Sequence, residues 1–133
     1  MITLVELYAT GICNDAELRA RMLQSPKARH THQYVAIKDG SEVAFLALDQ
    51  IPGVSYLVLY EIFVRRDCRG RGIGSRLLGE VEGVAKDLDY ERITVSPRPL
   101  EEGHPEEKLI AWYKRHGYVE RTDCPIELEK RIG

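Results

Sequence analysis

The sequence has few cysteines, no excess of either charge and no long apolar run. Its three cysteines, Cys13, Cys68 and Cys124, are far apart and form no Cys-x-x-Cys pair, so we expect neither a disulfide framework nor a zinc site. The formal net charge of −2 and the pI near 6.1 give no reason to expect nucleic acid or an anionic membrane as a partner. No stretch approaches the ~20 apolar residues of a membrane span, and the first residues lack the basic start of a signal peptide. We therefore expect a cytoplasmic protein that uses no metal.

What the chain does contain is the material for one globular domain. Its 133 residues are 44% hydrophobic, which is enough for a core. The N-terminal part predicts a strand at 2–7, a helix near 15–24 and a loop at 27–32. Asn14 and Glu17 resemble a capping box at the start of that helix. Asp39-Gly40 between the β-rich runs 33–38 and 42–48 predicts a hairpin.

The rest of the chain alternates strands and helices. An apolar run at 56–64, broken only by Glu61, is typical of a central strand buried on both faces. Helical spacing follows from Ile73 to Leu88. A strand at 92–95 precedes a helix from Glu106 to His116 that stops at Gly117, and short strands at 118–119 and 126–130 close the chain. We therefore predict a mixed α+β fold in one domain, residues 1–133.

A glycine-rich turn, Arg69-Gly70-Arg71-Gly72-Ile73-Gly74, joins the strand at 56–64 to the helix after it. Glycine lacks a Cβ, so an anionic group can approach its backbone closely, and the first N–H groups of a helix have no internal partner. The positive end of the helix dipole adds to this attraction. Four arginines crowd the turn and would neutralise further phosphate charge: Arg65, Arg66, Arg69 and Arg71. The turn therefore predicts a pyrophosphate site.

Two common phosphate-binding motifs do not fit this turn. A Walker A loop needs a lysine after its glycines, and none follows here. A dinucleotide fingerprint, Gly-x-Gly-x-x-Gly, needs a glycine where the chain has Ser75 or Leu77. What remains is the pattern Arg-x-x-Gly-x-Gly, filled by Arg69, Gly72 and Gly74.

This pattern, between a strand and a long helix, resembles the acetyl-CoA signature of the GNAT N-acetyltransferase superfamily. A second match lies downstream in Ala111-Trp112-Tyr113-Lys114-Arg115-His116-Gly117-Tyr118. There a helix with an aromatic-tyrosine pair ends at a glycine and an aromatic residue. Two motifs in the family's order are more specific than either one alone, and the resemblance covers roughly residues 34–119.

The resemblance implies a fold, a co-substrate and a set of binding residues. The fold is a central, mostly antiparallel twisted sheet of about six or seven strands with helices on both faces, splayed between the strands near 56–64 and 91–96. The co-substrate is acetyl-CoA, and the acceptor is a primary amine of a small molecule or a protein. Backbone groups of Phe63 and Val64 would bind the pantetheine arm. Amides of the turn would hold the pyrophosphate, namely those of Arg69, Gly70, Arg71, Gly72, Ile73, Gly74 and Ser75.

The resemblance also implies catalytic residues. Tyr113 matches the position that protonates the leaving CoA thiolate in many members, and its ordinary pKa of ~10 lies above the ~8.5 of a thiol. An ordinary packing role for Tyr113 is the alternative. The neighbouring arginines would lower the pKa of Cys68, but direct attack by the amine is the usual family mechanism, so we do not expect an acyl-cysteine.

A base is needed because the acceptor amine must be neutral to attack. Glu61 is the only charged residue of its strand, and a glutamate on this strand is the base in several relatives, directly or through water. It is either such a base or an ion-paired structural group. Alternation places it on the same face as Phe63. His104, in a proline-bracketed loop, is the second candidate.

The sequence departs from the family pattern in its pantetheine and acceptor regions. Many members carry an asparagine between the last two motif elements, whereas the only asparagine here is Asn14; the longer segment 96–105 stands in its place. The N-terminal half is short, which is compatible with a homodimer. A cationic acceptor is one hypothesis, because glutamates gather at the expected acceptor end: Glu61, Glu101, Glu102, Glu106 and Glu107.

Two other functions stay open at this point. The same fold could serve as a non-catalytic acyl-CoA-binding sensor or interaction module. The basic turn could also bind other anions, such as nucleotides.

Overall fold

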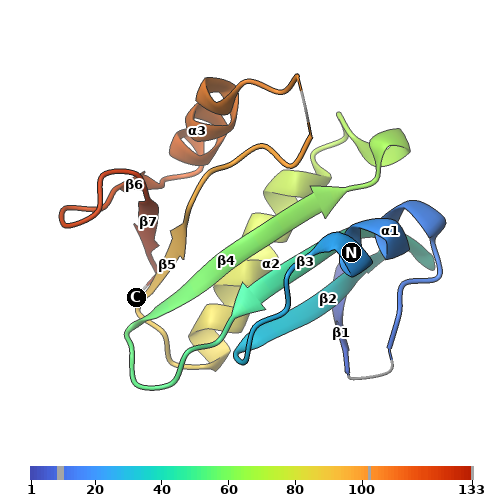
Figure 1. Ribbon diagram of the computed structural model, residues 1–133, viewed down its shortest axis with the longest axis horizontal. Helices are drawn as coiled ribbons and strands as arrows, with labels where there is room; N and C mark the ends of the chain where they lie inside the picture. Colours follow the sequence, from blue (N-terminus) through green and yellow to red (C-terminus); the bar gives the residue numbers. More distant parts are fainter. Residues whose placement is uncertain (9–10, 102, 133) are drawn as a thin grey trace.

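Seven β-strands form one sheet in the computed structural model, which describes residues 1–8, 11–101 and 103–132 (Figure 1). Their order across the sheet is β1-β2-β3-β4-β5-β7-β6, and only β4 and β5 run parallel. The predicted mostly antiparallel sheet is therefore confirmed. The strands are β1 (Ile2–Leu7), β2 (Thr31–Lys38), β3 (Ser41–Asp49), β4 (Tyr56–Val64), β5 (Arg92–Val95), β6 (Val119–Glu120) and β7 (Leu128–Arg131).

The hairpin between β2 and β3 turns where the sequence predicts it. Asp39 has φ 52° and Gly40 has φ 78°, the pair of positive values that a tight two-residue turn requires. The start of β2 differs from the expectation, because Thr31 and His32 already pair with β3. The Thr31 hydroxyl donates to Asp49 Oδ1 at 2.6 Å, and this cross-strand bond extends the strand into the segment predicted as a loop.

Helix α1 (Ala16–Gln24) begins one residue later than the predicted capping box. Asp15, not Asn14, is the N-cap, and its Oδ1 accepts from the Leu18 N–H at 2.9 Å. The backbone N–H of Asp15 donates to Glu42 Oε1 at 2.6 Å. This contact with β3 fixes where the chain enters the helix.

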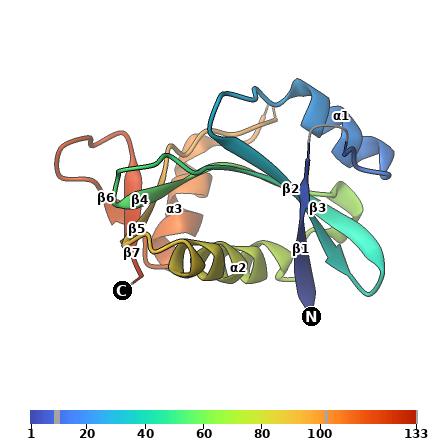
Figure 2. The same cartoon turned by 90° about the horizontal axis from the view of Figure 1, so that it is seen from below.

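Helices cover both faces of the sheet, as Figure 2 shows. Helix α1 packs on one face over a core that includes Leu7, Leu18, Phe45 and Phe63. Helix α2 (Ile73–Asp87) packs on the other face over the larger core, to which helix α3 (Glu106–Arg115) adds Tyr113. Among the described residues, every helix is too short or too polar to pass through a membrane.

The ends of α3 and the two closing strands lie close to their predicted positions. His116 is the C-cap of α3, and Gly117 follows with φ 92°. The Tyr118 N–H donates to the Tyr113 carbonyl at 3.2 Å, as in a glycine-terminated helix. Strands β6 and β7 each lie one or two residues later than predicted, and their cross-strand pairing sets these bounds.

Strand β4 carries the feature that positions the site. It pairs with β5 only from Tyr56 to Leu59, and from there to Val64 its edge on that side is open, so the predicted splay is confirmed. On its other side, Leu59 pairs with Leu48 and Glu61 pairs with Ala47, which leaves Tyr60 as a bulge. A bulge bends a strand and redirects its side chains, and this one lies where the sheet opens.

Candidate active site

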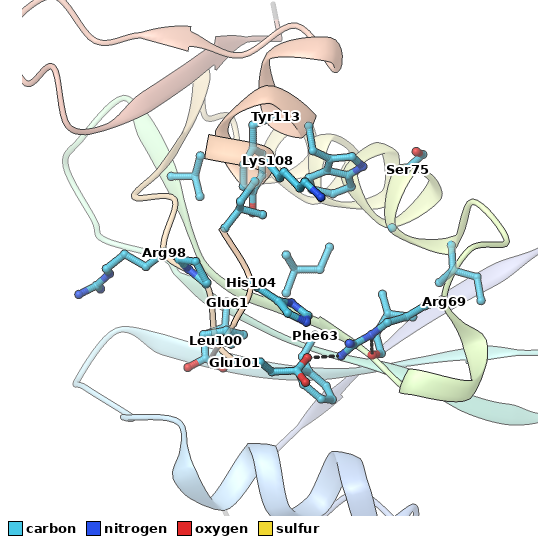
Figure 3. Close-up of a pocket in the computed structure, with 18 of the residues that line it drawn as sticks. Glu61, Phe63, Arg69, Ser75, Arg98, Leu100, Glu101, His104, Lys108 and Tyr113 are labelled. Atoms are coloured by element: carbon cyan, nitrogen blue, oxygen red, sulfur yellow. Dashed lines mark hydrogen bonds and ion pairs between the residues drawn. The ribbon is translucent and has the colours of Figure 1, made fainter. Parts of the chain in front are cut away.

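A cleft of about 780 Å³ opens where β4 and β5 part. Its walls are the end of β4, the glycine-rich turn with the start of α2, the loop between β5 and α3, and one side of α3 (Figure 3). Side chains reach it from both faces of the sheet. Tyr113 comes from the face of α2 and α3, and Glu61, which is ion-paired with α1, comes from the other.

The structure brings all but one of the predicted cofactor-binding residues together. Those that line the cleft are Phe63, Val64, Arg69, Gly70, Gly72, Ile73, Gly74 and Ser75. Arg71 does not line it and is exposed to solvent. The two predicted catalytic residues, Glu61 and Tyr113, and the second candidate base, His104, also line the cleft.

Two of the glycines in the turn have positive φ, and a third packs closely against α3. Gly70 has φ 77° and Gly72 has φ 76°, values that other residues adopt only with strain. Gly74 lies in the first turn of α2 against α3, and a Cβ there would lie 3.0 Å from Cζ2 of Trp112. The glycine therefore allows the helices that carry the two sequence motifs to meet.

The first turn of α2 presents backbone donors to the cleft. Its N-cap is Gly72, which has no side chain to bond the helix start. The Arg76 N–H reaches the Gly72 carbonyl at 3.2 Å, which places the N–H groups of Ile73, Gly74 and Ser75 ahead of the helix's own bonds. Such a helix start favours anions through its free donors and its dipole.

The arginines of the turn are less free than the sequence suggests. Arg69 Nη2 lies 2.7 Å from Glu101 Oε1, and Arg66 Nη2 lies 2.9 Å from Glu101 Oε2. Arg69 also donates from Nε to the Val64 carbonyl at 2.9 Å. Arg65 is paired with Asp67. Of these four arginines, only Arg71 has no ion pair with a described residue, so the expectation that all four add free positive charge is wrong.

Glu101 therefore ties the loop between β5 and α3 to the turn after β4, as the dashed line to Arg69 in Figure 3 shows. Burial acts to raise its pKa, but hydrogen bonds from Arg69 and Arg66 outweigh burial and lower that pKa. The carboxylate is thus charged at neutral pH.

Glu61 is buried and ion-paired. It is 6% exposed, and its Oε2 lies 3.2 Å from Nε of Arg21 on α1. Burial raises the pKa of Glu61, while the Arg21 charge acts in the opposite direction. It lies on the same face as Phe63, as alternation predicts, and that face carries α1.

Tyr113 is buried to 3% exposure, and burial raises the pKa of its phenol. Its ring packs edge-on against Trp112 at 5.0 Å and against Tyr118 at 5.4 Å between centroids. The phenol therefore keeps its proton at neutral pH. Arg65 and Arg71 act to lower the pKa of Cys68, as expected, but burial and Asp67 outweigh them and raise that pKa.

The chain has the sequence features of a known protein family. Residues 29–120, more than half of the chain, match the acetyltransferase (GNAT) domain. The chain belongs to the GNAT acetyltransferase family.

Solved structures of GNAT proteins share the fold over nearly the whole chain. A GNAT family acetyltransferase from Elizabethkingia anophelis with acetyl-CoA bound has 16% identity and a TM-score of 0.67, over 98% of this chain and 97% of that one. The ribosomal-protein-S18-alanine N-acetyltransferase from Escherichia coli has 17% identity and a TM-score of 0.71, over 100% and 95%. No curated protein matches the sequence.

The GNAT cleft here differs from the sequence expectation in its charge. Its two glutamates, Glu61 and Glu101, are both ion-paired with arginine, whereas Arg98, Lys108 and Arg115 line it without an ion pair to any described residue. Glu106 and Glu107 are exposed and do not line it, and Glu102 lies outside the described residues. The hypothesis of a cationic acceptor thus gains no unpaired carboxylate from the described part of the cleft.

Proposed function

We propose that this chain is an N-acetyltransferase that moves an acetyl group from acetyl-CoA to a primary amine by direct attack in a ternary complex. One observation carries the proposal: in a GNAT chain, the end of β4, whose edge toward β5 is open, leads through the glycine turn to the open first turn of α2. The strand edge suits an extended chain with amides. The helix start suits the phosphates, and the cleft volume suits a ligand of this kind.

Particular backbone groups of the described residues would bind particular parts of acetyl-CoA. Phe63 and Val64 would bond the pantetheine amides along the open edge of β4. Because the Val64 carbonyl already accepts from Arg69, the pantetheine bond there would use the second lone pair of that oxygen. Amides of Ile73, Gly74 and Ser75 would hold the pyrophosphate.

The proposed chemistry places an acid and a base on opposite sides of the reacting carbon. The amine nitrogen forms a bond to the thioester carbonyl carbon, and the carbon–sulfur bond breaks. Tyr113, from the α3 side, gives its proton to the leaving sulfur. Glu61, from the α1 side, or a water takes the proton that the amine loses. The raised pKa of Glu61 suits a proton acceptor near neutral pH.

Binding of the co-substrate is tested by thermal shift with acetyl-CoA. The wild type should be stabilised, and Gly72→Glu, which puts a negative side chain into the phosphate site, should abolish the shift. ATP should not compete with CoA, because it lacks the pantetheine arm. A shift that survives Gly72→Glu, or no shift in the wild type, would contradict the proposed site.

Catalysis is tested by a screen of amines that reports release of CoA. Tyr113→Phe should lower kcat by about 10²-fold or more with little change in CoA affinity. Tyr118→Phe is the matched control, because Tyr118 packs against Tyr113 but does not line the cleft. Equal turnover of the Tyr113→Phe variant would remove the proposed acid.

A non-catalytic acyl-CoA-binding module is the second candidate. The ion pair between Glu61 and Arg21 favours it, since a carboxylate held by an arginine is a weaker base. Binding of CoA without transfer to any amine of a broad panel would support this candidate over the enzyme.

A further inference from the structure

A hydrogen-bonded chain links the first turn of α2 to the end of α3. Ser75 Oγ lies 2.8 Å from Nε2 of His116, and Nδ1 of His116 lies 2.7 Å from the Trp112 carbonyl oxygen. Ser75 lines the cleft beside the proposed phosphate site. No local motif singles out His116, because its partner Ser75 lies 41 residues earlier.

The Trp112 carbonyl determines where the protons of this chain lie. A carbonyl oxygen only accepts, so Nδ1 of His116 must carry a hydrogen and donate it. In the neutral imidazole, Nε2 then has no hydrogen and accepts one from the Ser75 hydroxyl. The hydroxyl hydrogen therefore points to His116, and only the lone pairs of Oγ are left toward the phosphate site.

Protonation of His116 reverses this bond. An imidazolium donates from both nitrogens, so Nε2 would donate to Ser75 Oγ and release the hydroxyl hydrogen. Ser75 could then donate to a phosphate oxygen. The neutral form repels an anion locally, and the charged form attracts it twice, through its charge and through the freed hydroxyl.

The charged groups that the structure describes around His116 are cationic or already ion-paired, so none of them holds that charge. His116 makes no ion pair with any described residue. On its own helix Arg115 is cationic and Lys114 is paired with Glu120, and its ring lies 4.9 Å from that of Trp112. From β7, Lys130 lies against Gly117 and is paired with Glu82 of α2. The start of α2, which carries Ser75, adds the positive end of a helix dipole. The counter-charge would have to come from the ligand.

We infer that binding of the CoA pyrophosphate is coupled to uptake of one proton by His116, which turns the Ser75 hydroxyl toward the phosphate. This inference rests on the proposed function and adds a positioning residue to it. The proton comes from solvent and returns to it on release of the ligand. Affinity for the ligand therefore increases as the pH falls.

The test uses acetyl-dephospho-CoA as the ligand. It keeps the pyrophosphate but lacks the 3′-phosphate, whose own titration near pH ~6 would mask that of a histidine. Its acetylated sulfur does not titrate either. Isothermal titration calorimetry at pH 7 in two buffers of different ionisation enthalpy counts the protons taken up, and a pH series from 8 to 6 follows the affinity.

The wild type should take up a fraction of one proton, and its affinity should rise about fivefold or more between pH 8 and pH 6. His116→Asn and His116→Gln, which cannot titrate, should bind with no proton uptake and a change below about twofold. His104→Asn, which removes the histidine that lines the cleft itself, should keep the proton uptake of the wild type.

Three results would overturn the inference: no proton uptake by the wild type, uptake that persists in both His116 variants, or uptake lost in His104→Asn. Any of these would leave the acetyltransferase proposal standing, because the ligand still binds. No binding of acetyl-dephospho-CoA or of acetyl-CoA by the wild type would instead refute the proposed function, and this inference with it.

Discussion

Replacing Arg21 by leucine should leave a buried carboxylate without its counter-charge. Glu61 is 6% exposed and lies 3.2 Å from Arg21, so water can replace its partner only in part. Removing one partner of such a pair typically costs about 3–5 kcal/mol. We expect the lower figure, about 3 kcal/mol at pH 8, because the cleft beside Glu61 gives water some access.

The loss of unfolding free energy in this variant should depend on pH, and the shift in the pKa of Glu61 determines the direction. Burial raises the pKa of Glu61 and Arg21 opposes that increase, so removing Arg21 raises the pKa further. A carboxyl whose pKa is higher in the folded state binds more protons folded than unfolded. The contribution of this carboxyl to stability is thus most favourable below its ordinary pKa of ~4.3. That contribution is lost as the pH rises through the pKa that the carboxyl has in the folded state. The variant should therefore be less impaired at pH 5 than at pH 8, by up to about 1.4 kcal/mol per pH unit.

Urea unfolding at pH 5, 6.5 and 8, followed by circular dichroism, measures this loss. Arg19→Leu is the matched control on the same helix, because the bonds of Arg19 to the described residues are two long ones to backbone carbonyls, at 3.4 Å. The double variant with Glu61→Gln should recover much of the stability, since no charge is left buried. A loss equal to that of Arg19→Leu, or the same at all three pH values, would refute the reasoning.

Three further predictions concern packing and reactivity. Gly74→Val should lower the free energy of unfolding by about 1–3 kcal/mol, because its Cβ would lie 3.0 Å from the Trp112 ring; Gly79→Val, in open space on the same helix, should cost clearly less in the same urea assay. Tyr118→Phe should be neutral or stabilising in thermal denaturation, since the buried Tyr118 hydroxyl has no hydrogen-bond partner among the described residues, and a loss above about 1 kcal/mol would show a missed partner. Cys13 should resist alkylation in the native protein and react once the protein is unfolded, because burial and Glu42 raise the pKa of its thiol to about 11. Mass spectrometry measures the label, and labelled Cys13 in the native protein would contradict this prediction.

Much of the fold could be predicted because its determinants are local. Asp39-Gly40 turns the hairpin with its own backbone preferences, and Gly117 ends α3 in the same way. The start of β2 was missed because Thr31 is held by Asp49, 18 residues away. Local pattern contains no information on such a contact.

The backbone elements of the candidate site could be predicted from the sequence, but the ion pairs of its charged side chains could not. The glycine turn and Tyr113 follow from motifs and line one cleft. The arginines looked free in the sequence, whereas Glu101, more than thirty residues later, pairs with two of them. The pair between Arg21 and Glu61 joins residues 40 positions apart, so only the folded chain shows it.

The bulge at Tyr60 shifts the alternation of side chains along β4 by one residue, so the strand buries different faces before and after it. Before it, Leu57 and Leu59 belong to the core under α2; after it, Glu61 and Phe63 face α1. The number of residues in this strand therefore matters as much as their kind. Strict alternation without the bulge would put Glu61 on the same face as Leu57 and Leu59, and would therefore place an acid in the apolar core under α2. Grafts and alignments of this segment should accordingly be anchored separately on each side of the bulge.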